Sequence, residues 1–397
     1  MKKNNKPKVL IYFDIKELKP IGGPSGYLYN LNEELKKISI DNIEFLNLEK
    51  SLIRKVFDLI PKRIQKIIKN KFNPGTREIM KNVFSKKIKI SPIDLNQYDI
   101  IHFHSALSMY LVKDSLTNYT GKVIFTTHCP KVSHKEIIED FTSKKFYEKN
   151  KKTLDNLEII DEYAFNRADY ILFPTEEAEE CYYNTWDKYH IIKESNKEKY
   201  IYLPTGIKSV YSKIDKNEIR EKYNIPKDAF IISFVGRHNI VKGYTFLKNI
   251  ATKMLENKKI YFLIAGKEEP YLGLKNKNWI EVGWTDDPYS IINASNLFIL
   301  PNKETYFDLV LLETMCLGKQ IVLTETGGNK YFKKYNLESL QFCKYDDIND
   351  AIKAINYFKN LNKDIGYLNK QLFEKNFTIN IFAQNYINIL NEIYDKK

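Results

Sequence analysis

The sequence predicts an α/β protein built from two similar halves, each a doubly wound parallel sheet with helices on both faces. Short apolar runs recur along the chain, and each is followed by a polar or glycine-containing turn and then by a helical pattern. This alternation runs to about residue 207 and begins again at Phe230. At 397 residues the chain is longer than a usual single domain, so we expect two domains of about 200 residues each.

In the N-terminal half, Val9–Phe13 predicts the first strand, and a glycine-rich turn with Gly22 and Gly23 leads into a helix. Glycines let a backbone approach a ligand closely, and the first amides of a helix can bind an anion. Tight packing of the strand against the helix would use the same residues. The turn is therefore either a ligand loop or a packing element.

Two later strands of this half, 98–105 and 123–130, end in histidines. Ligands of parallel sheets bind at the carboxyl ends of the strands, so His104 and His128 are candidate site residues. A histidine at a strand end can equally be structural. No third side chain stands at a zinc-ligand spacing from these two, so a zinc site is not expected.

Residues 51–90 have a different composition. Basic and apolar residues interleave from Arg54 to Lys71, and Asp58 is the one acidic residue of this segment before Glu78. This pattern is typical of a basic amphipathic helix pair on an anionic membrane surface. Helices with a solvated face over a core have the same pattern, so both interpretations stand.

In the second half, Phe230–Val235 predicts a strand, and the turn that follows it contains Gly236, Arg237 and Lys242. Two cations at the end of one strand can converge on a diphosphate, Arg as a forked donor and Lys as a point charge. The next strand, 259–267, runs into a turn at Gly266.

The stretch 297–318 reads as strand, polar loop and helix, and the helix ends at Gly318. Glu313 is a carboxylate in an otherwise apolar part of that helix. A buried carboxylate needs a partner, and the hydroxyl pair of a ribose would serve.

Two shorter motifs flank this stretch. Asp287 before Pro288 predicts a helix N-cap rather than half of a metal-binding pair with Asp286. The glycine turn at 324–330 either offers amides to an anion or caps a helix.

These motifs resemble the donor site of family-4 glycosyltransferases of the GT-B fold. The second acid of the family signature falls on Glu313, which by this resemblance grips the nucleotide ribose. The first acid falls on Thr305, and Glu304 replaces it only if the loop shifts by one residue. The implied catalytic residues are His128, Arg237 and Lys242; the implied donor-binding residues are Gly22, Gly23, Gly236, Gly266, Glu304, Thr305, Phe307, Asp308, Leu309 and Glu313.

The resemblance implies two Rossmann-like domains that face a central cleft. The two domains are an acceptor-side domain at 1–207 and a nucleotide-sugar domain at 208–376. A C-terminal helix at 377–397 crosses back to the first domain. The implied activity is transfer, with retention, from a nucleoside-diphosphate sugar, UDP-sugar above all, to a glycan or lipid-linked acceptor in capsule or cell-surface polysaccharide synthesis. No Asp-any-Asp motif occurs, so no metal or other cofactor is expected. The alternative is a non-catalytic partner subunit, because Thr305 replaces an acid.

The composition limits which partners and which cellular compartment we expect for this protein. The net charge of +13 favours an anionic partner, and an anionic membrane could be contacted through 51–90. No nucleic-acid reader motif accompanies the charge, so nucleic acid is not expected. Four scattered cysteines fit a reducing compartment, and no run approaches the roughly 18 apolar residues of a membrane span. We therefore expect a cytoplasmic protein, soluble or peripheral at the inner face of the membrane.

Overall fold

The computed structural model describes residues 6–13, 18, 23–46, 74–85, 91, 93–361 and 363–396. Gly22 and most of the basic segment 51–90, including the run from Arg54 to Lys71, lie outside the described residues. The chain forms two compact units. The first comprises Met1–Phe173, Tyr182–Leu203 and Ala383–Lys397, and the second comprises Pro174–Cys181 and Pro204–Phe382. The main division, after Leu203, lies close to the boundary expected near residue 207.

The first unit is built on a parallel six-stranded sheet of order β2-β1-β3-β4-β5-β6. Its strands are β1 Val9–Tyr12, β2 Ile43–Phe45, β3 Ile100–Phe103, β4 Lys122–Thr126, β5 Tyr170–Phe173 and β6 Tyr200–Tyr202. All four residues of β1 and of β3 are buried, as expected for strands that are covered on both faces.

The helices of the first unit include a long α1 after the first strand. They are α1 Gly23–Lys37, α4 Pro74–Val83, α5 Ala106–Tyr110, α6 Lys113–Leu116, α7 Ser133–Phe141, α8 Lys144–Asp155, α9 Ile159–Arg167, α10 Glu180–Thr185 and α11 Tyr189–Asn196; α10 begins in the second unit, which contains Glu180 and Cys181.

The second unit is built on another parallel six-stranded sheet, of order β12-β11-β10-β7-β8-β9. Its strands are β7 Phe230–Val235, β8 Ile260–Ala265, β9 Trp279–Gly283, β10 Leu297–Leu300, β11 Gln320–Thr324 and β12 Leu340–Cys343. Its helices are α12 Lys216–Lys222, α13 Tyr244–Met254, α14 Pro288–Ala294, α15 Leu309–Cys316, the 3-10 helix η5 Gly327–Tyr335, α16 Ile348–Asn360 and α17 Tyr367–Asn376.

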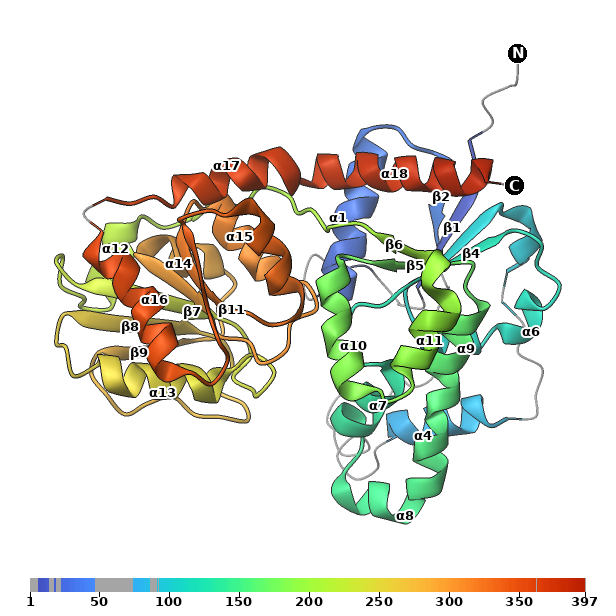
Figure 1. Ribbon diagram of the computed structural model, residues 1–397, viewed down its shortest axis with the longest axis horizontal. Helices are drawn as coiled ribbons and strands as arrows, with labels where there is room; N and C mark the ends of the chain where they lie inside the picture. The colour runs from blue at the N-terminus through green and yellow to red at the C-terminus, as the bar shows by residue number, and fades with distance from the viewer. Residues whose placement is uncertain are drawn as a thin grey trace, which may run out of the picture. The chain divides into compact units, whose positions relative to one another are not determined.

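Alternate residues of the second sheet enter two separate cores. Ile232 and Phe234 pack with residues of α13 and α16, whereas Ile231 and Leu263 pack with residues of α12 and α14 (Figure 1). This period of two places helices on both faces, so the predicted α/β fold class is confirmed.

The strand orders locate the point in each sheet where the chain reverses its direction of winding. In the first sheet this point lies between β1 and β3, and in the second it lies between β7 and β10. Loops at such points separate from each other and leave room for a ligand at the carboxyl ends of the strands.

The last helix, α18 Ile379–Asp395, belongs to both units: Ile379–Phe382 is counted with the second and the remainder with the first. Across the described ranges, no helix combines the length and the hydrophobicity that crossing a bilayer requires.

Candidate active site

Two loops meet at the reversal point of the second sheet. Gly243, in the loop after β7, has a φ of 63°, and a Cβ atom there would lie 1.7 Å from the carbonyl oxygen of Pro301. Only glycine fits, and the loop therefore presses on the end of β10. The backbone N–H of Lys303 donates to the Val241 carbonyl at 3.0 Å, which ties the two loops together.

An ion pair joins the same two loops. Lys242 Nζ lies 2.5 Å from Asp308 Oδ1, and both side chains are about one-fifth exposed or less. Asp308 is also the N-cap residue of α15, although its carboxylate does not cap the helix amides. The structure thus brings together two motifs that the sequence analysis identified separately. It also shows that Lys242 already has an acidic partner, Asp308.

Arg237 is the more open of the two candidate cations. Its side chain is exposed, and within the described ranges it forms no ion pair. The two cations therefore differ: Arg237 can meet an anion directly, whereas Lys242 already donates one of its three N–H groups to Asp308.

Glu313 lies on α15 and is largely buried. Tyr289 of α14 donates a hydrogen bond from its hydroxyl to Glu313 Oε1 at 3.2 Å. Burial raises the pKa of Glu313 to about 7, the charge of Asp308 adds to this effect, and the Tyr289 hydrogen bond opposes it. A carboxylate with so little solvation gains much from two further hydroxyl donors, as a ribose would provide.

Thr305 supports the loop from within. Its side chain is 1% exposed and shares hydrogen bonds of 3.2 Å with Asn302 Nδ2 and with the Thr326 hydroxyl. Its carbonyl accepts from the Gly328 N–H at 3.0 Å. Glu304, the neighbouring acid, is only partly buried, and its backbone N–H points to the Val241 carbonyl.

The glycine turn at 324–330 is occupied by an acid of the chain itself. Glu180 accepts from the Gly327 N–H at 3.0 Å and pairs with Lys330. A Cβ at Gly327 would lie 1.9 Å from the Thr305 carbonyl oxygen, and one at Gly328 would lie 2.0 Å from that of Tyr306. The Gly327 amide, at the first residue of η5, therefore binds an anion of the chain itself, and the two glycines also permit close packing, which the sequence did not predict.

Three glycines line up at the ends of β7, β8 and β9. Gly266 N–H donates to the Gly283 carbonyl at 2.9 Å, and the Gly236 N–H donates to Ala265 at 3.0 Å. A Cβ at Gly266 would lie 2.0 Å from the Gly236 carbonyl oxygen, so glycine allows these turns to close on each other. Trp284, directly after Gly283, is 74% exposed.

The other predicted residues near this loop pack in the core or begin helices. Phe307 is buried and its ring stacks on Phe332 with centroids 5.8 Å apart. Leu309 is the first residue of α15. Asp287 accepts from the Ser290 N–H at 3.2 Å, so the predicted N-cap of α14 is confirmed. Among the described residues, no three His, Cys, Asp or Glu side chains gather as a metal site would require.

The reversal point of the first sheet holds a histidine cluster. His104 Nδ1 lies 2.9 Å from His128 Nε2, and both residues border a cavity of about 180 Å³. His102, behind them, uses both ring nitrogens, toward the Tyr386 hydroxyl of α18 at 2.7 Å and the Thr126 hydroxyl at 2.8 Å. His102 is thus structural, whereas His104 and His128 face a space that a ligand could enter.

Gly23 begins α1 beside this cluster. A Cβ at Gly23 would meet no atom within 4 Å, so packing does not require glycine at this position. Of the two interpretations of the first glycine turn, close packing therefore finds no support at Gly23.

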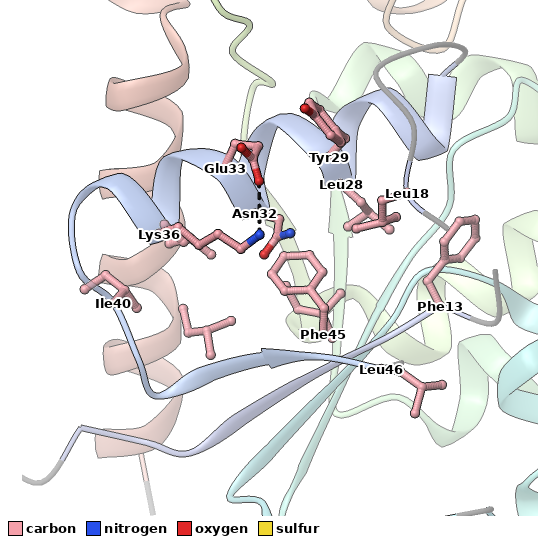
Figure 2. Close-up of a pocket in the computed structure, with 13 residues that line it drawn as sticks. Phe13, Leu18, Leu28, Tyr29, Asn32, Glu33, Lys36, Ile40, Phe45 and Leu46 are labelled. Atoms are coloured by element: carbon pink, nitrogen blue, oxygen red, sulfur yellow. Dashed lines mark hydrogen bonds and ion pairs between the residues drawn. The ribbon is translucent and has the colours of Figure 1, made fainter. Parts of the chain in front are cut away.

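A larger chamber of about 570 Å³, lined mainly by apolar residues, lies between α1 and the strands β1 and β2 (Figure 2). Leu28 of α1 and Phe45 of β2 face each other across it, and the Glu33–Lys36 ion pair stands on the α1 side. Phe13 lines both this chamber and the histidine cavity. A chamber lined mainly by apolar residues therefore adjoins a cavity lined mainly by polar ones.

Two doubly wound parallel sheets, each with its own reversal point, define the GT-B class of glycosyltransferase folds, and comparison with solved structures agrees. The structure is similar to sucrose-phosphate synthase from Thermosynechococcus elongatus, with a TM-score of 0.64 at 16% identity over 99% of this chain and 100% of the other. It is also similar to Anabaena Alr3699/HepE in complex with UDP and glucose, with a TM-score of 0.62 at 13% identity over 97% of this chain and 99% of the other.

Residues 229–358, which contain the Arg237, Lys242 and Glu313 sites, match the model of the family described as Glycosyl transferases group 1. The Escherichia coli O-antigen biosynthesis glycosyltransferase WclY is 23% identical over 234 residues, which are 53% of this chain and 62% of that protein. The E. coli UDP-Gal:alpha-D-GlcNAc-diphosphoundecaprenol alpha-1,3-galactosyltransferase is 26% identical over 192 residues, 44% of this chain and 49% of that protein. These matches span less than two thirds of each relative.

Proposed function

We propose that this protein is a retaining, metal-independent glycosyltransferase that moves a sugar from a UDP-sugar to a lipid-linked glycan in the synthesis of a cell-surface polysaccharide. The observation that carries the proposal is the joining of the Arg237–Lys242 loop to the N-terminus of α15 at the reversal point of the second sheet, with Glu313 on the same helix. A nucleoside diphosphate matches that set of groups, because it presents a diphosphate and a ribose diol together.

In this mechanism the protein supplies charge and position rather than a covalent nucleophile. The bond between C1 of the sugar and the diphosphate oxygen breaks, and a bond forms between C1 and an acceptor hydroxyl oxygen. Arg237 and Lys242 stabilise the negative charge that develops on the diphosphate, and Glu313 holds the ribose. Attack on the same face as the departing diphosphate gives retention, and that diphosphate takes the proton of the acceptor hydroxyl.

The acceptor proposal has support in the first unit. His128 borders a polar cavity suited to sugar hydroxyls, and Phe13 separates this cavity from the apolar chamber of about 570 Å³. A lipid-linked acceptor has the same two parts, a glycan and a hydrocarbon chain. One relative named above acts on a diphosphoundecaprenol-linked sugar, which agrees with this choice. Such an acceptor would bring the protein to the inner face of the membrane.

The chamber can be tested by narrowing it. Asn32 lines the chamber from α1 and is half-buried, so Asn32→Trp should raise the KM for a long-chain lipid-linked acceptor and leave that for a short-chain analogue unchanged. Asn30→Trp, at a half-buried position of the same helix outside the chamber, is the matched control. Equal KM values for the long-chain acceptor in the two variants would remove the chamber from the proposal.

The alternative is a non-catalytic partner of the same fold. It is favoured by Thr305, whose hydroxyl is buried where the resemblance places an acid, and by Asp308, whose carboxylate stands at Lys242. The two functions separate in one assay, in which the purified protein is given labelled UDP-sugars with and without a lipid-linked acceptor. Label transferred to the lipid supports the enzyme. Nucleotide binding with neither sugar transfer nor donor hydrolysis supports the non-catalytic partner.

A further inference from the structure

The hydrogen bond between His104 and His128 restricts which nitrogen of His128 can carry a proton. The bond joins His104 Nδ1 to His128 Nε2 at 2.9 Å, so one of these two nitrogens donates and the other accepts. A neutral imidazole carries one proton, and therefore only two arrangements are possible.

The surroundings of His104 favour one arrangement. His104 is 3% exposed, and its Nε2 is buried without a hydrogen-bond partner among the described residues. A proton on Nε2 would leave a buried N–H unused, which is rare in proteins. A proton on Nδ1 is used at once, because His128 Nε2 accepts it.

The consequence for His128 follows directly. If Nε2 accepts from His104, the proton of His128 resides on Nδ1, which has no hydrogen bond to any described residue. His128 borders the cavity of about 180 Å³, so this N–H is available to a ligand there. Burial lowers the pKa of His128 to about 3, so the ring is neutral at pH 7.

We propose that His104 is a positioning residue that holds His128 in the Nδ1–H tautomer, so that His128 donates a hydrogen bond to a sugar hydroxyl. The identity of the ligand rests on the proposed function, whereas the tautomer does not. In this state His128 cannot act as a general base, because one nitrogen is protonated and the other is occupied. This agrees with the proposed mechanism, in which the diphosphate takes the proton of the acceptor hydroxyl.

The tautomer can be measured without any activity. Protein with ¹⁵N-labelled histidine, studied by long-range ¹H–¹⁵N correlation, distinguishes protonated from unprotonated ring nitrogens, and His128→Asn assigns the signal. We expect a protonated Nδ1 and an unprotonated Nε2 on His128. A protonated Nε2 overturns the proposal, even if the protein transfers sugar.

Two variants of His104 then test the role of the tautomer. Asn places an amide N–H where His104 has Nδ1, whereas Phe keeps a ring beside His102, whose ring centroid is 4.0 Å from that of His104, but donates nothing. His104→Asn should retain kcat/KM within about threefold and keep the Nδ1–H signal, and His104→Phe should lose about tenfold, the value of one hydrogen bond.

Wild-type kcat/KM in His104→Phe, with its unfolding midpoint unchanged, would overturn the role of His104. A wild-type protein that shows the Nδ1–H signal but no transfer would refute the proposed function and leave the tautomer assignment standing. If His104→Phe does not fold, the wild-type spectrum still decides the tautomer.

Discussion

Glu313→Gln should make the unliganded protein more stable at pH 8 while it weakens nucleotide binding. Burial raises the pKa of Glu313 from an ordinary value of 4.5 to about 7 in the folded protein. The folded state therefore holds its proton more tightly than the unfolded state, and stability falls as the pH rises from 4.5 through 7. A difference of about 2.5 pKa units corresponds to about 3 kcal/mol above pH 7.

The glutamine variant keeps the shape of the side chain and can still accept from Tyr289, but it has no charge to bury. Its free energy of unfolding, measured by urea titration, should exceed that of the wild type by about 3 kcal/mol at pH 8 and by roughly 1 kcal/mol at pH 5. Glu256→Gln, an exposed carboxylate after α13, is the control and should show no such difference.

Nucleotide binding should change in the opposite direction. A ribose diol donates to both oxygens of a carboxylate, and the amide loses one acceptor and the charge, so the Kd for UDP should rise about tenfold or more. Wild-type affinity for a UDP-sugar should also improve as the pH rises through 7. The reasoning would be refuted if Glu313→Gln were no more stable than the wild type at pH 8. It would also be refuted if the difference in their free energies of unfolding grew as the pH falls.

Two further predictions concern the joined loops. Asp308→Asn removes the acid that faces Lys242, so UDP should bind about three- to tenfold more tightly in calorimetry; weaker binding would show that Asp308 helps to hold the nucleotide. Gly243→Ala places a Cβ 1.7 Å from the Pro301 carbonyl oxygen at a φ of 63°, so it should lower the urea midpoint and abolish UDP binding, whereas Asn249→Ala, at an exposed position of α13, should do neither. Equal effects of the two alanines would contradict the packing role of Gly243.

Short sequence patterns predicted the strands and the ends of several helices. Apolar runs bounded by glycine or proline predicted the strands, Asp287 before Pro288 predicted the start of α14, and Gly318 predicted the end of α15. These features depend on residues a few positions apart, so the sequence contains them directly.

Other parts of the site depend on contacts between distant residues, and no local pattern contains those. The Lys242–Asp308 pair joins residues 66 positions apart, and the bond from the Gly327 N–H to Glu180 joins residues 147 apart. Tyr386 reaches His102 across 284 positions. Thr305 shows the same limit, because its place in the signature suggested a ligand contact, and only the fold reveals that its hydroxyl bonds to Asn302 and Thr326.

The central claim is that residues 229–358 bind a nucleoside diphosphate through Arg237, and calorimetric titration with UDP tests it most directly. Wild-type protein and Lys303→Ala, an exposed lysine of the neighbouring loop, should bind UDP with similar Kd values. Arg237→Ala should bind at least tenfold more weakly, as expected when a charged hydrogen-bond donor to phosphate is lost. Equal binding by Arg237→Ala and Lys303→Ala, or no binding of UDP by the wild type, would contradict the account.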